Sequence, residues 1–106
     1  MDPHRLAEER SLAYHRLVAE KMSTDESVIA RAQRRVGEWR ASEAVHQEYV
    51  EAWMRILELP REELTQALLD PGERGRALRQ VTPFAGAIDP RTRWRIWREV
   101  RARSTP

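Results

Sequence analysis

The chain of 106 residues contains no cysteine. This absence excludes a disulfide framework, a thiolate metal site and a cysteine nucleophile, and it is compatible with a reducing cytoplasm. No apolar run approaches the length of a membrane span, and the N-terminal residues Met1–Arg5 lack the apolar core of a signal peptide. We therefore expect a cytoplasmic protein that has no membrane partner.

Large apolar residues are also scarce, because Leu, Ile, Val and Phe together number only 21. Highly charged chains with fewer such residues remain disordered. The net charge here is only +2, and the apolar residues recur periodically, so the sequence predicts a folded chain. A domain of this size buries roughly 60–70% of its unfolded surface. We expect one helical domain over residues 1–103, a tail at 104–106, and a thin core that a partner can extend.

Familiar catalytic and cofactor motifs are missing as well. The sequence has no glycine-rich phosphate loop, no HExxH, no GxSxG and no EF-hand loop. The histidines have no partner at ligand spacing, so we expect no metal and no cofactor. Each aspartate stands where a helix is expected to start, and all four are assigned to capping: Asp2, Asp25, Asp70 and Asp89.

What is present is helical periodicity, which predicts an all-α, compact single-domain bundle of five to six helices. The segment 81–88 contains Pro83 and Gly86 and cannot be a regular helix. Phe84, the one phenylalanine, is expected to insert this segment into the core. The expected helices span residues 3–22, about 23–40, about 42–59, from 60 to the turn at 70–72, 73–80 and 90–103.

Several helix starts rest on short motifs. Ser23 to Glu26 fits a capping box, and Ser42 is a candidate cap for the third helix. Gly37 lies inside the second helix, where it either permits close helix contact or is simply tolerated. The side chains expected to share one core are Val36, Trp39, Tyr49, Trp53, Ile56, Leu64, Leu68 and Trp94.

The last helix carries the most informative pattern. Trp94, Ile96, Trp97 and Val100 are interpreted as one broad apolar arc that fills the core, as in any amphipathic helix. The opposite side presents a row of arginines, Arg91, Arg95 and Arg98. This row either is solvated surface or binds phosphates or an acidic protein surface. Tryptophans beside arginines can also stack on bases, an option that their burial would remove.

Charge is distributed unevenly between the two parts of the chain. Residues 1–72 carry 10 basic and 14 acidic side chains, a net −4, whereas residues 73–106 carry 9 arginines against 3 acidic side chains, a net +6. Either the basic part meets an anionic partner, or it packs on the acidic body of the same chain. The helix at 73–80 loosely resembles the second helix of a helix-turn-helix and would present Arg74, Arg76 and Arg79 to DNA.

Two arginine–histidine spacings raise an enzymatic alternative. HEPN ribonucleases, which are all-helical, use an arginine followed after four to six residues by a histidine. Arg10 to His15 and Arg40 to His46 match this spacing. Because the chain has 18 arginines, such matches are expected by chance, and we predict that the protein is not an enzyme. A small HEPN-like ribonuclease stays as an alternative, and a DNA-binding transcriptional regulator is another.

The stretches Ala77–Gly86, Asp89–Trp94 and Ser11–Arg16 resemble small bacterial helical proteins found in two-gene loci of toxin–antitoxin type. This resemblance implies a non-enzymatic, antitoxin-like protein that binds and restrains a partner protein, the cognate toxin. The resemblance does not identify any site residues in this chain, because no functional site is defined for that group of proteins. We expect the basic C-terminal part to contact DNA as a further partner, and a homodimer is compatible with the sequence. The predicted contact residues are Arg91, Arg95, Arg98, Arg74, Arg76 and Arg79.

Overall fold

Helices make up about three-quarters of the described part of the chain, residues 2–104 of a computed structural model, and this part contains no strand. The prediction of an all-α single-domain bundle is confirmed. The last helix includes Ser104, one residue more than expected, and residues 105–106 of the predicted tail lie outside the described residues. The helices are α1 (Pro3–Met22), α2 (Ser27–Ser42), α3 (Gln47–Leu57), α4 (Arg61–Leu68), α5 (Glu73–Gln80) and α6 (Pro90–Ser104).

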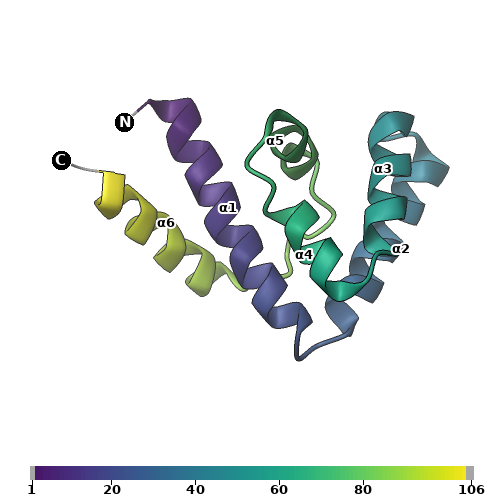
Figure 1. The fold of residues 1–106 in the computed structure, drawn as a ribbon, viewed down its shortest axis with the longest axis horizontal. Helices are drawn as coiled ribbons and strands as arrows, with labels where there is room; N and C mark the ends of the chain where they lie inside the picture. The colour runs from purple at the N-terminus through teal and green to yellow at the C-terminus, as the bar shows by residue number, and fades with distance from the viewer. Residues whose placement is uncertain (1, 105–106) are drawn as a thin grey trace.

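Helix α1 is the element around which the others are arranged. It contacts α6 along one side and α2 and α4 on the other, while α3 packs against α2 and α4 (Figure 1). Helix α6 therefore lies at one edge of the molecule and α2 and α3 lie at the opposite edge. The radius of gyration is 14.0 Å, slightly above the value of about 13 Å typical of a compact chain of this length. The edge position of α6 leaves one of its sides in solvent.

Two of the expected aspartate caps, those of α1 and α6, are formed as the sequence predicts. The Asp2 carboxylate accepts the His4 N–H at 3.0 Å. Asp89 accepts the Thr92 N–H at 2.9 Å and the Thr92 hydroxyl at 2.7 Å. These hydrogen bonds, first of all the one from the Thr92 side chain, hold the pKa of Asp89 below its ordinary value. The expected Asp70 cap of α5 is wrong: Asp70 accepts the Gly72 N–H at 2.9 Å within the turn, and α5 begins after Gly72 with no side-chain cap.

Helix α2 begins later than its expected capping box indicates. The Ser23 hydroxyl donates to the Glu20 carbonyl and so closes α1 instead of opening α2. The cap acceptor is Asp25, which accepts both the Ser27 N–H at 3.0 Å and the Ser27 hydroxyl at 2.6 Å. The expected start at Ser23 is wrong because α1 uses that residue for its own last carbonyls.

Helix α3 also begins later than expected. Ser42 is the last residue of α2, and Glu43, with a φ of 57°, ends that helix in the left-handed conformation. The side chain that caps α3 is His46, whose Nδ1 accepts the Glu48 N–H at 3.1 Å. The expected Ser42 cap is therefore wrong, and residues 43–46 form a connection that the sequence pattern did not indicate.

The core lies between α1, α2, α3 and α4. Of the expected core residues, Val36, Trp53, Leu64 and Leu68 are buried, and Trp39, Tyr49 and Ile56 are half-buried against them. Phe84 is 1% exposed, which confirms that the 81–88 segment is inserted. That segment contains no helix, as expected.

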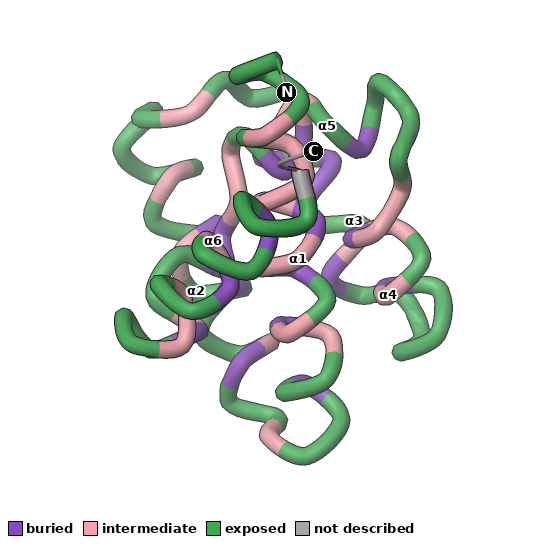
Figure 2. Tube along the Cα trace, turned by 90° about the vertical axis from the view of Figure 1, so that its left-hand side faces the viewer, coloured by how far each residue is buried: buried purple, intermediate pink, exposed green. Residues whose placement is uncertain are grey.

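The expectation that Trp94 joins this core is wrong, because its side chain is 63% exposed. Helix α6 meets α1 through a face that contains the buried residues Ile96 and Val100. At about 100° per residue, Trp94 lies roughly 120–160° around the helix from these two residues. Figure 2 shows the exposed outer side of α6 facing the viewer and its buried residues turned inward.

Two helical glycines differ in what surrounds them. A Cβ atom built on Gly37 meets nothing within 4 Å, so this glycine is tolerated and does not permit a close helix contact. A Cβ atom built on Gly75 would lie 2.1 Å from the Asp70 carbonyl oxygen. The close approach of α5 to the turn before it therefore requires glycine at position 75.

The two glycines make a matched pair for a stability measurement. Gly37→Ala is expected to raise the free energy of unfolding by about 1 kcal/mol, because alanine favours a helix. Gly75→Ala is expected to lower it by about 1–3 kcal/mol, because the new methyl group overlaps the Asp70 backbone. Urea unfolding of both variants checks the signs. A stabilised Gly75→Ala protein would contradict the packing of α5 described here.

Candidate functional site

The 81–88 segment is held in place by side chains rather than by backbone pairing. Its carbonyl groups point toward α1 and α2 and accept hydrogen bonds from them, which satisfies a stretch of backbone that has no regular structure. Tyr14 Oη donates to Phe84 O at 2.6 Å, Arg35 Nη1 to Ala85 O at 2.7 Å and Lys21 Nζ to Ala87 O at 2.7 Å. The segment is thus fixed on the helices along most of its length.

Phe84 anchors the same segment through aromatic contacts. Its ring meets Trp53 edge-to-face, with centroids 5.9 Å apart, and meets His15 in the same geometry at 6.3 Å. Such edge-to-face pairs are favourable beyond the area that they bury. The contacts join α1, α3 and the 81–88 segment at one point.

His15 is buried at 1% exposure and uses both ring nitrogens. Nδ1 lies 2.7 Å from the Ser11 carbonyl oxygen, which can only accept, so Nδ1 carries the proton. Nε2 then accepts from the Thr82 hydroxyl at 2.8 Å. The Thr82 oxygen in turn accepts the Phe84 N–H at 3.1 Å. A neutral His15 is therefore the acceptor that positions the start of the segment.

The environment of His15 keeps it neutral at physiological pH. Burial, the largest effect, lowers the pKa of His15 to about 4; the Ser11 carbonyl opposes this shift, and the positive charge of Arg79 adds to it. A neutral histidine with both nitrogens bonded and almost no exposure has no free position for proton transfer to a substrate.

Beside His15 a cavity of about 400 Å³ opens between α1, the 81–88 segment and α6. Three arginines from different elements border it: Arg10 of α1, Arg79 of α5 and Arg93 of α6. Among the described residues no carboxylate borders this cavity. The other polar or aromatic side chains along it are Ser11, Tyr14, His15, Thr82 and Trp97.

Arg79 is the most deeply buried of the three, with a side chain that is 2% exposed. Its Nη1 donates to the carbonyls of Leu68 and Asp70 at 3.1 and 2.6 Å and so caps the end of α4. Its Nη2 lies 3.7 Å from a Glu8 carboxylate oxygen. Burial lowers the pKa of Arg79, and the charges of Glu8 and Asp70 oppose this shift.

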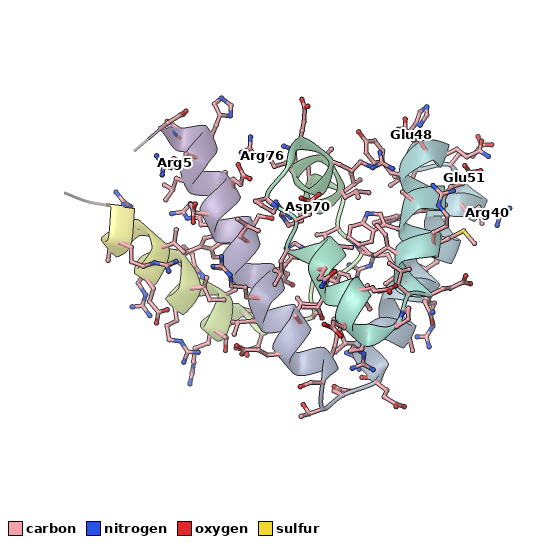
Figure 3. All side chains as sticks on the ribbon, viewed as in Figure 1. Arg5, Arg40, Glu48, Glu51, Asp70 and Arg76 are labelled. Carbon is pink, nitrogen blue, oxygen red and sulfur yellow. The ribbon has the colours of Figure 1, made fainter. Side chains whose placement is uncertain are left out.

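The arginines predicted as contact residues on α5 are engaged within the chain. Arg74 pairs with Glu48 of α3 at 3.3 Å, and Arg76 pairs with Glu8 of α1 at 2.6 Å. Figure 3 shows Arg76 between α5 and α1. Here the basic part of the chain packs on the acidic body. Arg79, being buried, cannot join a surface row, and the helix-turn-helix role of α5 stays a prediction without a free arginine row to support it.

On α6 the predicted residues lie as the helical spacing indicates. Arg91, Arg95 and Arg98 are all exposed. Within residues 2–104, Arg95 alone of these three has an ion pair, with Glu99 at 3.9 Å, and both partners are solvated. Trp94 stands beside this row and packs edge-to-face on Trp97, whose ring lies 5.0 Å from the guanidinium carbon of Arg93. The role of the row in binding stays a prediction.

The two arginine–histidine spacings lie at separate places. Arg10 and His15 border the cavity described above, and Arg40 and His46 border another of about 490 Å³ together with Glu43 and Glu51. His46 is exposed, but its Nδ1 is used to cap α3. His15 is buried and bonded at both nitrogens, and His46 uses one nitrogen as a cap, so neither imidazole beside these arginines has both nitrogens free.

Arg93 is the site residue that sequence reasoning missed. It precedes Ile96 by three and Trp97 by four residues, so helical spacing places it on their face. This spacing could have indicated Arg93, but a single arginine on a partly apolar helix face is usually interpreted as solvated surface. Arg10 was considered from the sequence only because of its spacing from His15 along the chain.

No group of three or more metal-ligating side chains occurs among residues 2–104. Within the same range, none of the helices combines the length and apolar character needed to cross a membrane. Comparison with known proteins adds no relative. No family model, no curated protein and no solved structure matches the chain.

The buried His15 predicts a pH dependence of stability. Its folded pKa of about 4 lies below the ordinary value of 6.5, so the unfolded chain binds more protons between these values. The free energy of unfolding is therefore expected to fall as pH drops from about 6.5 to 4, by about 3 kcal/mol in total. Urea unfolding across this range measures the slope.

Two variants test whether His15 causes this slope. His15→Gln is expected to remove most of it, whereas His4→Gln, which changes an exposed histidine on the same helix, is expected to retain it. An unchanged slope in His15→Gln would assign the pH dependence to other groups.

Proposed function

We propose that this protein is a non-enzymatic helical binding protein that docks on an acidic surface of a partner protein through the outer face of α6. We define this docking face by Trp94, Arg91, Arg95 and Arg98. The observation that carries the proposal is the 63% exposure of Trp94 within a row of exposed arginines. Tryptophan and arginine are the residue types most enriched among side chains that dominate binding energy.

The docking face is organised before any partner arrives. Trp94 rests on Trp97, which itself lies under Arg93, so the exposed ring is held by packed neighbours. A side chain that is already ordered loses less conformational entropy on binding. This arrangement supports the interpretation of Trp94 as part of a preorganised contact surface and not as an isolated exposed aromatic residue.

Charge points to the kind of partner. The arginines of α5 are engaged by Glu8, Glu48 and backbone carbonyls, so the basic excess of residues 73–106 is displayed mainly by α6. An acidic protein surface complements such a row, because a guanidinium pairs with a carboxylate through two parallel hydrogen bonds. The resemblance to proteins of toxin–antitoxin loci makes the product of a neighbouring gene the first partner to test.

A second candidate function is binding of nucleic acid. Stacking of a tryptophan on a base requires that the tryptophan is exposed, and Trp94 meets this requirement. An exposed tryptophan beside arginines can stack on an unpaired base while the arginines contact phosphates. Salt separates the two candidates, because counterion release makes nucleic-acid affinity fall steeply as salt rises.

The triple variant Arg91→Glu, Arg95→Glu and Arg98→Glu tests the docking face. Affinity for the co-expressed product of the neighbouring gene is expected to fall at least about tenfold, since several charge-assisted hydrogen bonds are lost. Trp94→Ala is expected to weaken the same complex. Titration calorimetry measures the affinity, and circular dichroism checks that the helices remain.

A matched control reverses three exposed arginines elsewhere: Arg31→Glu, Arg34→Glu and Arg55→Glu on α2 and α3. It changes the net charge by the same amount and is expected to keep the complex. Equal affinity in the two triple variants would contradict the docking face. Binding of an oligonucleotide with a steep salt dependence, lost in the α6 variant alone, would favour the second candidate.

Purified protein is expected to leave RNA intact. His15 is buried and neutral, and the Nδ1 atom of His46 caps a helix, so neither is placed as a general acid or base. Incubation with labelled single-stranded RNA at several pH values checks this. Cleavage that disappears in Arg10→Gln or in His46→Gln, with folding unchanged, would support the HEPN-like alternative instead.

A further inference from the structure

The cavity between α1, the 81–88 segment and α6 gathers polar groups that the fold leaves unsatisfied. Four guanidinium nitrogens in the described residues are buried without a hydrogen-bond partner: Arg10 Nε, Arg79 Nε, Arg79 Nη2 and Arg93 Nε. All three arginines border this one cavity. Buried donors of this kind are rare in folded proteins, and each calls for an explanation.

Contacts within residues 2–104 account for only part of each guanidinium group. Arg79 caps α4 through Nη1 alone and has Glu8 at a distance of 3.7 Å. Arg10 has no hydrogen bond or ion pair within residues 2–104, and the contact described for Arg93 is with the ring of Trp97. Three arginines from three helices thus border one cavity whose wall has no carboxylate.

The gathering of three arginines with unpartnered buried nitrogens distinguishes this cavity from the others along the described residues. The cavity on the α2 side of the 81–88 segment is also bordered by three cations and no carboxylate, Lys21, Arg31 and Arg35. Lys21 and Arg35 donate there to the Ala87 and Ala85 carbonyls, and none of the three has a buried nitrogen without a partner. The cavity beside Trp39 is bordered by Glu43 and Glu51 in addition to Arg40. The cavity on the other side of the α1–α6 contact is bordered by Glu20 and Glu99.

We propose that the cavity binds a small organic phosphate through the guanidinium groups of Arg10, Arg79 and Arg93. A phosphate monoester carries up to two negative charges and three acceptor oxygens, which suits several arginine forks better than a single carboxylate does. The volume of about 400 Å³ falls in the range of small-molecule sites and exceeds what a bare phosphate fills. The Ser11 and Thr82 side chains and the rings of Tyr14 and Trp97 border the space left for the organic part.

The site is distinct from the docking face and does not depend on it. Arg93 and Trp97 are half-buried on the α1 side of α6, whereas Arg91, Arg95 and Arg98 are exposed on the outer side. The two surfaces meet only through the contact between Trp97 and Trp94. Ligand binding in the cavity can therefore be measured without a partner protein.

Titration calorimetry with adenosine monophosphate, ribose 5-phosphate and inorganic phosphate tests the proposal. The first two are expected to bind, more tightly than inorganic phosphate, and adenosine, ribose and acetate are expected not to bind. Arg10→Gln combined with Arg93→Gln is expected to weaken binding by about tenfold or more, since each change removes charged donors. The control pair Arg5→Gln and Arg103→Gln removes the same charge from the same two helices and is expected to retain binding.

Nuclear magnetic resonance of the unaltered protein provides a second test, which does not depend on whether the variants fold. Added adenosine monophosphate is expected to shift the amide signals of Ser11, Thr82 and Gly86 and to leave those of the α2–α3 end unchanged. The proposal is overturned if none of the phosphate probes binds, or if adenosine or acetate binds equally well. It is also overturned if the two variant pairs bind equally, or if the shifted amide signals lie outside the cavity.

Discussion

The insertion of Phe84 between His15 and Trp53 is the contact on which the rest of the structure depends. It brings a segment without regular structure into the core, where Tyr14, Lys21 and Arg35 satisfy the carbonyls around it. Helix α6 follows directly from this segment, so its place against α1 is set by how the segment is seated. The cavity has the same origin, because the inserted segment forms one of its walls.

His15 links this packing to polar chemistry. Its neutral ring accepts from Thr82, and Thr82 in turn accepts from the Phe84 backbone, so one chain of hydrogen bonds runs from α1 into the segment. Burial of the imidazole is the main cause of its lowered pKa, and the positive charge of Arg79 adds to it. The same burial that suits His15 to hold the segment makes it unsuited to acid–base catalysis.

The basic part of the chain serves two different purposes. On α5 the arginines tie that helix to α1, α3 and the end of α4, which is an internal role. On α6 one set is turned outward beside Trp94, and Arg93 is turned inward beside Arg10 and Arg79. The inner set supports the proposed phosphate site and the outer set the proposed docking face. A short helix at the edge of the bundle can carry both because it has only one main neighbour.

The sequence by itself determined the helical class, the aspartate caps other than that of Asp70, the irregular 81–88 segment and the insertion of Phe84. These features depend on local periodicity and on single residue types. It also placed Arg91, Arg95 and Arg98 together, since three- and four-residue spacings repeat on any helix. Only the tertiary structure decided that Ser23 closes one helix instead of opening the next, that Trp94 lies outside the core, and that Arg10, Arg79 and Arg93 meet. The last two outcomes depend on which side of α6 faces α1. That orientation is fixed by packing between segments far apart in the chain, as in the contact of Tyr14 with Phe84, 70 residues away.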